Sequence, residues 1–117
     1  MSGSGPQLAS FREVVDLPVG YEDPRTGEVY KEAEVRAVTG GDELAVGMSR
    51  EYNSYPNDLI YKTLLLARCV VRLGSKTVIS VDDIKRLHAQ DLRKLEYVVY
   101  RLTYGAEAIP EPDGASG

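Results

Sequence analysis

The sequence predicts an α+β fold, an N-terminal β-hairpin followed by a small bundle of three to four helices. Two stretches in which apolar and polar residues alternate come first, and a turn sequence separates them. Several helix-start signals and one long apolar segment follow between residues 39 and 104. The chain has 117 residues, the length of one domain of ordinary size.

The hairpin is expected over residues 11–38. Its first strand, from Phe11 to Val19, alternates imperfectly, and the segment Asp23–Gly27 supplies a turn. The second strand is expected to turn four small or branched residues inward: Val29, Ala33, Val35 and Ala37. Because an isolated hairpin is only marginally stable, this one must cover its apolar face with helices or pair with strands of another copy or of a partner.

Helices are expected over residues 40–104. Thr39 and Asp42 form a capping box that opens a short helix through about Arg50, and residues 52–57 form a polar loop. Asn57 or Asp58 then caps the strongest element, a helix from Leu59 to Leu73 that Gly74 ends. Cys69 lies among apolar residues of this helix, which favours a place in the core over a redox role.

A second capping box, Ser80 with Asp83, opens a helix that buries Ile84 and Leu87. Around residues 88–90 the helix either continues or breaks. We expect a break, with Asp91 capping a last helix that Gly105 ends.

The two ends of the chain are rich in Gly, Ser and Pro, and they offer little apolar surface to bury. The sequence therefore predicts a disordered tail over residues 1–10, a single α+β domain over residues 11–104, and a disordered acidic tail over residues 105–117.

Composition excludes several classes of protein. The formal net charge of −4 disfavours nucleic acid and anionic membranes as partners. One Cys and one His can form neither an internal disulfide nor a zinc cluster. The longest apolar stretch contains three basic residues and is too short to span a membrane. We expect a cytoplasmic protein without metal or cofactor.

No common catalytic motif occurs in the sequence, so we expect that the protein is not an enzyme. His88 and Asp91 have the spacing of neighbours on a helix and could orient a general base. The sequence places no nucleophile or second acid beside them, which favours a histidine on a helix surface or in a loop.

Six residues are candidates for binding a protein partner. On the predicted central helix, Tyr61, Arg68 and Arg72 align as a cationic stripe for an acidic segment. Internal pairing of the two arginines with Glu32, Glu34 or Asp91 is an equally good explanation. On the last helix, Tyr97, Tyr100 and Tyr104 recur every three or four residues, which is typical of interfaces and of boundary packing alike.

Several short motifs follow one another in a familiar order. They are Leu17-Pro18-Val19-Gly20-Tyr21-Glu22-Asp23 with Gly27, Glu34 to Glu43, Leu65 to Gly74, Ser80 with Ile84, Leu87 and Asp91, and Tyr97 to Gly105. In this order the chain resembles the small tail assembly or baseplate-hub assembly proteins of contractile phages, Mu-like and T-even-like, and of related phage-tail-like injection systems. The resemblance covers most of residues 15–105.

The resemblance implies a non-enzymatic tail assembly chaperone that binds tape-measure or hub proteins during tail and baseplate assembly. The alternative is a permanent structural subunit of the baseplate or hub. Protein partners are expected in both cases, and self-association into a homo-oligomer is left open. The family offers no catalytic or binding residues that could be carried over to this chain.

Overall fold

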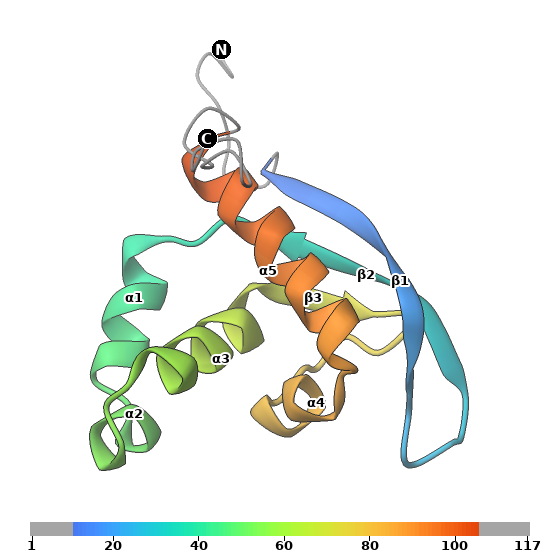
Figure 1. Ribbon diagram of the computed structural model, residues 1–117, viewed down its shortest axis with the longest axis horizontal. Coiled ribbons are helices and arrows are strands. Elements are labelled where there is room, and N and C mark those ends of the chain that lie inside the picture. The colour runs from blue at the N-terminus through green and yellow to red at the C-terminus, as the bar shows by residue number, and fades with distance from the viewer. Residues whose placement is uncertain (1–10, 106–117) are drawn as a thin grey trace, which may run out of the picture.

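The computed structural model describes residues 11–105, and it confirms the predicted α+β order of a hairpin followed by helices (Figure 1). The elements are β1 (Arg12–Glu22), β2 (Val29–Arg36), α1 (Gly40–Gly47), α2 (Arg50–Ser54), α3 (Asp58–Cys69), β3 (Val70–Leu73), α4 (Val81–Arg86) and α5 (Ala89–Tyr104). The predicted tails lie outside the described residues, except for Gly105, which caps the end of α5.

The three strands form one antiparallel sheet in the order β1-β2-β3. Helix α5 packs on β1 and β2, and it crosses the sheet diagonally in Figure 1. The opposite face of the sheet carries charged side chains, where Arg72 of β3 pairs with Glu32 at 3.1 Å and with Glu34 at 3.2 Å. The sheet therefore buries one face and exposes the other, as the alternation in β2 predicts.

A bulge interrupts β1 between Asp16 and Tyr21. Asp16 pairs with Glu32 and Tyr21 pairs with Tyr30, so four residues of β1 lie opposite the single residue Lys31. Gly20 in this bulge has a φ of 101°, a conformation that few other residues adopt. The bulge lets β1 run past the predicted end at Val19.

Asp91 holds the bulge against the first turn of α5. Its carboxylate accepts hydrogen bonds from the main-chain N–H groups of Val19 and Gly20, at 3.0 and 2.8 Å. The predicted helix break is confirmed, but the cap is His88, whose ring nitrogen accepts the N–H of Gln90. Asp91 instead lies three residues into the helix and is completely buried. The expectation that Asp91 caps α5 is therefore wrong, because its carboxylate is bound to β1.

The predicted helix from Leu59 to Leu73 is wrong at its C-terminal end. Of the two predicted caps, Asn57 is the one observed, so α3 begins at Asp58, and it ends at Cys69, because Val70–Leu73 is the strand β3. The β-branched Val70 and Val71 suit a strand, and β2 offers them a free edge. Gly74 does not end a helix but forms the turn after β3, where its N–H donates to the main-chain carbonyl of Glu32 at 2.8 Å.

Two smaller expectations are also corrected. Val29 is exposed and Tyr30 is buried, the reverse of the predicted facing, because the alternation within β2 is interrupted at Lys31 and Glu32, which are both exposed. Residues 52–54, predicted as part of a loop, belong to α2, which Ser49 caps. Both predicted capping boxes, Thr39 with Asp42 and Ser80 with Asp83, are confirmed.

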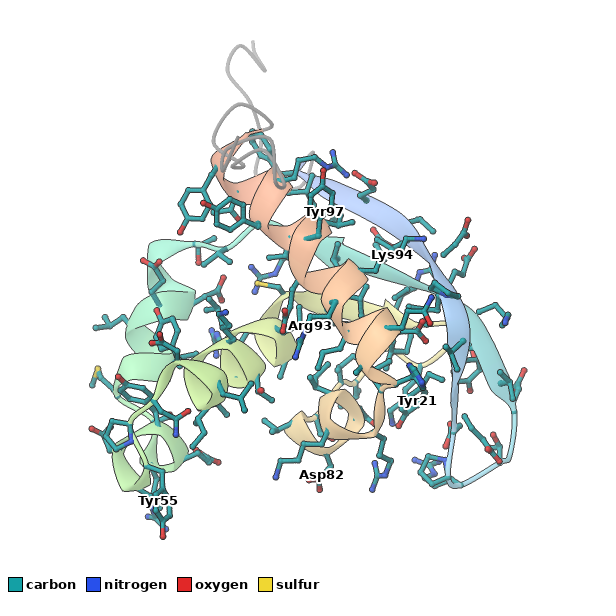
Figure 2. All side chains as sticks on the ribbon, in the orientation of Figure 1. Tyr21, Tyr55, Asp82, Arg93, Lys94 and Tyr97 are labelled. Carbon is teal, nitrogen blue, oxygen red and sulfur yellow. The ribbon has the colours of Figure 1, made fainter. Side chains whose placement is uncertain are left out.

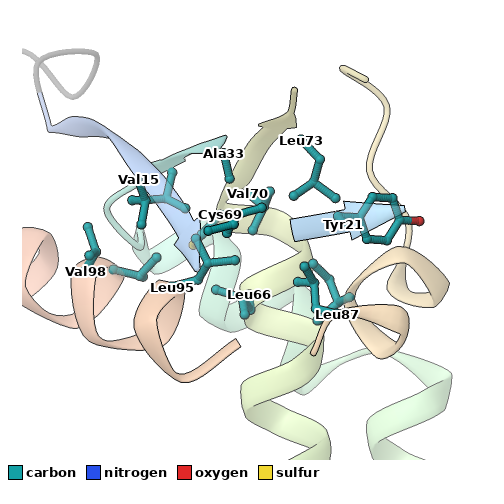
Figure 3. Close-up of a cluster of buried hydrophobic side chains, with 14 of the residues drawn as sticks. Val15, Tyr21, Ala33, Leu66, Cys69, Val70, Leu73, Leu87, Leu95 and Val98 are labelled. Atoms are coloured by element: carbon teal, nitrogen blue, oxygen red, sulfur yellow. The ribbon is translucent and has the colours of Figure 1, made fainter. Parts of the chain in front are cut away.

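The hydrophobic core lies between the sheet and helices α3, α4 and α5 (Figure 3). Val15 and Leu17 of β1 meet Leu66 of α3 and Leu95 of α5 in this cluster. Cys69 is fully buried there, as predicted, and burial raises the pKa of its thiol to about 11. The thiol is therefore protonated near neutral pH and behaves as a small apolar side chain. Between residues 11 and 105, no helix is long and apolar enough to cross a membrane.

Replacing Asp91 by Asn is expected to lower the free energy of unfolding by about 3 kcal/mol. The amide group of Asn cannot accept both N–H bonds, so one of the two main-chain donors of β1 loses its partner and faces the buried NH2 group instead. Urea unfolding followed by circular dichroism measures the loss. The matched control is Asp82→Asn, an exposed Asp in the first turn of α4, for which we expect a loss under about 1 kcal/mol. Equal losses in the two variants would contradict the role of Asp91.

Two Gly→Ala substitutions are expected to act in opposite directions. In Gly74→Ala the new Cβ would lie 2.3 Å from the ring of Tyr30, at a φ of +56°. We therefore expect the free energy of unfolding to fall by at least about 2 kcal/mol. In Gly47→Ala, at the end of α1, the new Cβ has nothing within 4 Å. Here we expect a gain of about 0.5 kcal/mol. Thermal unfolding of both variants checks the two signs.

Candidate functional site

An open, mostly apolar groove of about 580 Å³ lies between α3 and α5. Helix α3 lines it with Lys62, Leu65 and Leu66, and Val38 lines it from the segment after β2. Helix α5 contributes seven residues: Arg93, Glu96, Tyr97, Val99, Tyr100, Thr103 and Tyr104. The groove exists because α5 follows the sheet and α3 packs chiefly against α1 and α4, so the two helices diverge.

All three candidate tyrosines of α5 line this groove and are exposed. The rings of Tyr100 and Tyr104 lie 4.8 Å apart between centroids, so these two residues form a paired aromatic surface. Figure 2 shows Tyr97 and Arg93 on α5 and Tyr55 far from them, at the end of the molecule formed by α2. The structure therefore brings together half of the six sequence candidates.

The charged groups at the groove come from both helices. Arg93 pairs with Glu96 one turn away at 2.9 Å, and Lys62 lies across from them on α3. Within residues 11–105, Lys62 makes no ion pair. The groove thus combines an apolar floor, aromatic walls and one unpaired positive charge.

The predicted stripe of Tyr61, Arg68 and Arg72 does not form, because Arg72 lies in β3 and not in α3. Arg72 binds Glu32 and Glu34, which was the alternative explanation. Arg68 donates to neither of these residues but to Asp42, at 2.9 Å. Tyr61 packs edge to face on Tyr52, with ring centroids 5.7 Å apart. Asp91 pairs with neither arginine, because its carboxylate accepts hydrogen bonds from the main chain of β1.

Asp42 is the centre of a buried cluster that joins three elements. Its carboxylate caps α1, binds Arg36 of β2 at 2.7 Å, and accepts the bond from Arg68 of α3. The hydrogen bond from Arg36 is the main reason why the pKa of Asp42 lies well below its usual range, and the bonds from Thr39 and Arg68 add to it against the effect of burial. This arrangement links elements of the fold and leaves Arg68 engaged within the chain.

His88 is exposed at the start of α5, and its Nδ1 accepts the N–H of Gln90. Asp91, the partner that would orient it as a base, points into the core and binds β1. The two residues therefore do not form the pair that their spacing allowed. Among residues 11–105, no three His, Cys, Asp or Glu side chains are grouped to hold a metal ion.

The sequence pattern did not indicate the α3 side of the groove or the charged residues that line it. Lys62 and Leu65 lie one turn apart on the half-exposed side of α3, and Glu96 follows Arg93 at the same spacing. Their helical spacing was visible in the sequence. What it could not show is that α3 and α5 diverge, because this depends on the packing of both helices against other elements.

The chain matches no protein-family model, no curated protein and no solved structure. The resemblance to phage tail assembly proteins thus stays a prediction that rests on the motifs alone.

Replacing Asp42 by Asn is expected to reduce stability and to flatten its dependence on acid pH. Because the pKa of Asp42 is lowered in the folded protein, the unfolded chain takes up this proton first. Asp42 therefore stabilises the fold fully above about pH 4, and its contribution is lost as the pH falls towards the folded pKa. We expect Asp42→Asn to lower the free energy of unfolding by about 2 kcal/mol at pH 7. Below about pH 4, the free energy of unfolding of this variant should fall less steeply with pH than that of the original protein.

Urea unfolding at a series of pH values measures this difference. The control is Asp58→Asn in the first turn of α3, whose side chain is exposed and makes no ion pair in the described part of the chain. If the free energy of unfolding of the Asp42 variant falls with pH as steeply as that of the original protein, the role of the Asp42 carboxylate is contradicted.

Proposed function

We propose that the protein is a non-enzymatic assembly factor, a tail assembly chaperone of a contractile phage or phage-tail-like particle. It acts in the cytoplasm of the producing cell and binds tape-measure or hub proteins while the tail and baseplate assemble. The order of sequence motifs suggests this class, and the groove between α3 and α5 is the single structural observation that carries the binding function.

The groove suits an apolar helical segment of a partner protein. Amphipathic helices bind by placing a few large apolar side chains into a groove of this kind. A volume of about 580 Å³ has room for several such side chains. The exposed pair Tyr100 and Tyr104 supplies aromatic surface with hydroxyl groups that tolerate water, a combination enriched at interfaces.

The charges around the groove favour an acidic residue beside the apolar anchors of the partner. Lys62 is unpaired among the described residues and lies beside Leu65 at the wall of the groove. Arg93 is exposed, and among the described residues its ion pair is with Glu96. A partner carboxylate near Lys62 would gain an ion pair without breaking one.

The placement of the titratable residues supports a binding role over catalysis. His88 and Asp91 are separated by their different hydrogen-bond partners, and Cys69 is buried with a raised pKa. Arg68 and Arg72 are engaged in ion pairs within the chain, so reversing their charges would test the stability of the fold as much as partner binding.

The proposal is tested by co-expressing this chain with the tape-measure protein that is encoded by a neighbouring gene, followed by pull-down and titration. We expect a complex, and we expect Tyr100→Ala to weaken it about tenfold or more, because the substitution removes one ring of the aromatic pair that lines the groove. The control is Tyr55→Ala, which removes a tyrosine that is 73% exposed and remote from the groove. No complex at several salt concentrations, or equal losses in both variants, would contradict the proposal.

Mass spectrometry of purified particles separates the proposed chaperone from the alternative, a permanent baseplate or hub subunit. A chaperone is expected to be absent from the finished particle. A stoichiometric presence would assign the chain to the structure of the particle instead.

A further inference from the structure

Strand β1 forms one outer edge of the sheet, with β2 between it and β3 (Figure 1). The first part of β1, residues 12–16, pairs regularly with β2, and the bulge begins after it. Its outward side chains are Arg12, Val14 and Asp16, all three exposed, with Val14 at 50%. A regular, exposed strand edge can pair with a further strand.

The hydrogen-bond pattern shows which main-chain groups point away from the sheet. Ala37 donates its N–H to the carbonyl of Phe11 at 3.0 Å, so these two residues form a hydrogen-bonded pair. In antiparallel strands such pairs alternate, which places Glu13 and Val15 in bonds to β2. The N–H and C=O groups of Arg12, Val14 and Asp16 therefore point outward along the free edge. In the described part of the chain, no side chain or loop group binds them.

We propose that a second copy of this chain pairs with β1 along this edge, antiparallel and with Val14 on the two-fold axis. Arg12 then lies opposite Asp16 of the second copy, Val14 opposite its own equivalent, and Asp16 opposite Arg12. These are three hydrogen-bonded pairs, which exchange about six main-chain hydrogen bonds. The two three-stranded sheets become one sheet that continues across the axis.

Charge and the position of Pro18 disfavour three of the neighbouring registers. Within residues 12–16 the charged side chains on the outer face are Arg12 and Asp16, and in the chosen register each meets the opposite charge of the second copy. Arg12 also lies 3.9 Å from Glu34 of its own chain. A shift of the axis from Val14 to Val15 places Arg12 opposite Pro18, which has no N–H to donate. A shift to Asp16 places two aspartates opposite each other, and a shift to Arg12 does the same for two arginines.

The bulge limits the pairing to residues 12–16. Beyond them, the N–H groups of Val19 and Gly20 are bound to Asp91 and are unavailable to another strand. The groove between α3 and α5 contains no residue of β1, so the pairing leaves it open. The dimer would present two grooves, and it forms or fails independently of partner binding.

Sedimentation equilibrium over a range of protein concentrations, without any partner protein, tests the proposal. We expect a reversible dimer for the original chain and a monomer for Val14→Pro, which removes an N–H of the free edge and none that binds β2. Circular dichroism and thermal unfolding show whether this variant keeps its fold. A monomer at every concentration for the original chain, or a folded Val14→Pro variant that dimerises equally well, would overturn the proposal.

Charge exchange tests the register even where the proline variant does not fold. Arg12→Asp places two carboxylates opposite each other at both ends of the pairing, and we expect the dissociation constant to rise about tenfold. The double variant Arg12→Asp with Asp16→Arg restores opposite charges and should recover the dimer. The control, Arg25→Asp, makes the same charge change in the exposed turn between β1 and β2 and should leave the dimer unchanged. Failure of the double variant to recover, or an equal loss in the control, would overturn this register.

Discussion

The pair of hydrogen bonds from Val19 and Gly20 to the carboxylate of Asp91 is the constraint on which the rest of the structure depends. It joins the bulge of β1 to the first turn of α5, and the Asp91 side chain is completely buried. A buried carboxylate costs much free energy unless it is hydrogen-bonded, and an unpaired main-chain N–H is also costly. Each group therefore requires the other, so the position of α5 along the sheet and the place of the bulge are set together.

Two further aspartates join helices to the sheet in a similar way. Asp42, Asp83 and Asp91 are each the third residue of a helix, and all three are buried. At that position a carboxylate also interacts favourably with the positive end of the helix. Asp42 binds Arg36 of β2, and Asp83 accepts the hydroxyl of Tyr21 of β1 at 2.5 Å.

The pKa values of the second pair follow from this contact. Burial raises the pKa of Tyr21, and the bond to Asp83 adds to the rise. Burial alone would also raise the pKa of Asp83, but hydrogen bonds from Tyr21 and Ser80, with Lys76 nearby, hold it below its usual value. Helices α1, α4 and α5 are thus each oriented by a specific polar contact as well as by apolar packing.

This scheme explains why the candidate binding site lies where it does. Helix α5 is bound to β1 through Asp91, whereas α3 is bound to Asp42 and packs mainly against α1 and α4. The surface between them is free to remain open and apolar, with the tyrosines of α5 on one side. On the charged face of the sheet, Arg72 forms ion pairs with Glu32 and Glu34, so these charges are already paired within the chain.

The sequence by itself determined that a hairpin precedes the helices, and it determined both capping boxes, the helix break near His88 and the burial of Cys69. These features depend on residues close together in the chain, whose local chemistry has one good solution. Only the tertiary structure decided that Val70–Leu73 is a strand, because two valines suit a helix or a strand and the free edge of β2 selected between them. It alone decided the role of Asp91, whose partners lie more than 70 residues away in the chain. The spacing of Tyr97, Tyr100 and Tyr104 in the sequence indicated the α5 side of the groove. Its other side depends on how α3 packs against other elements.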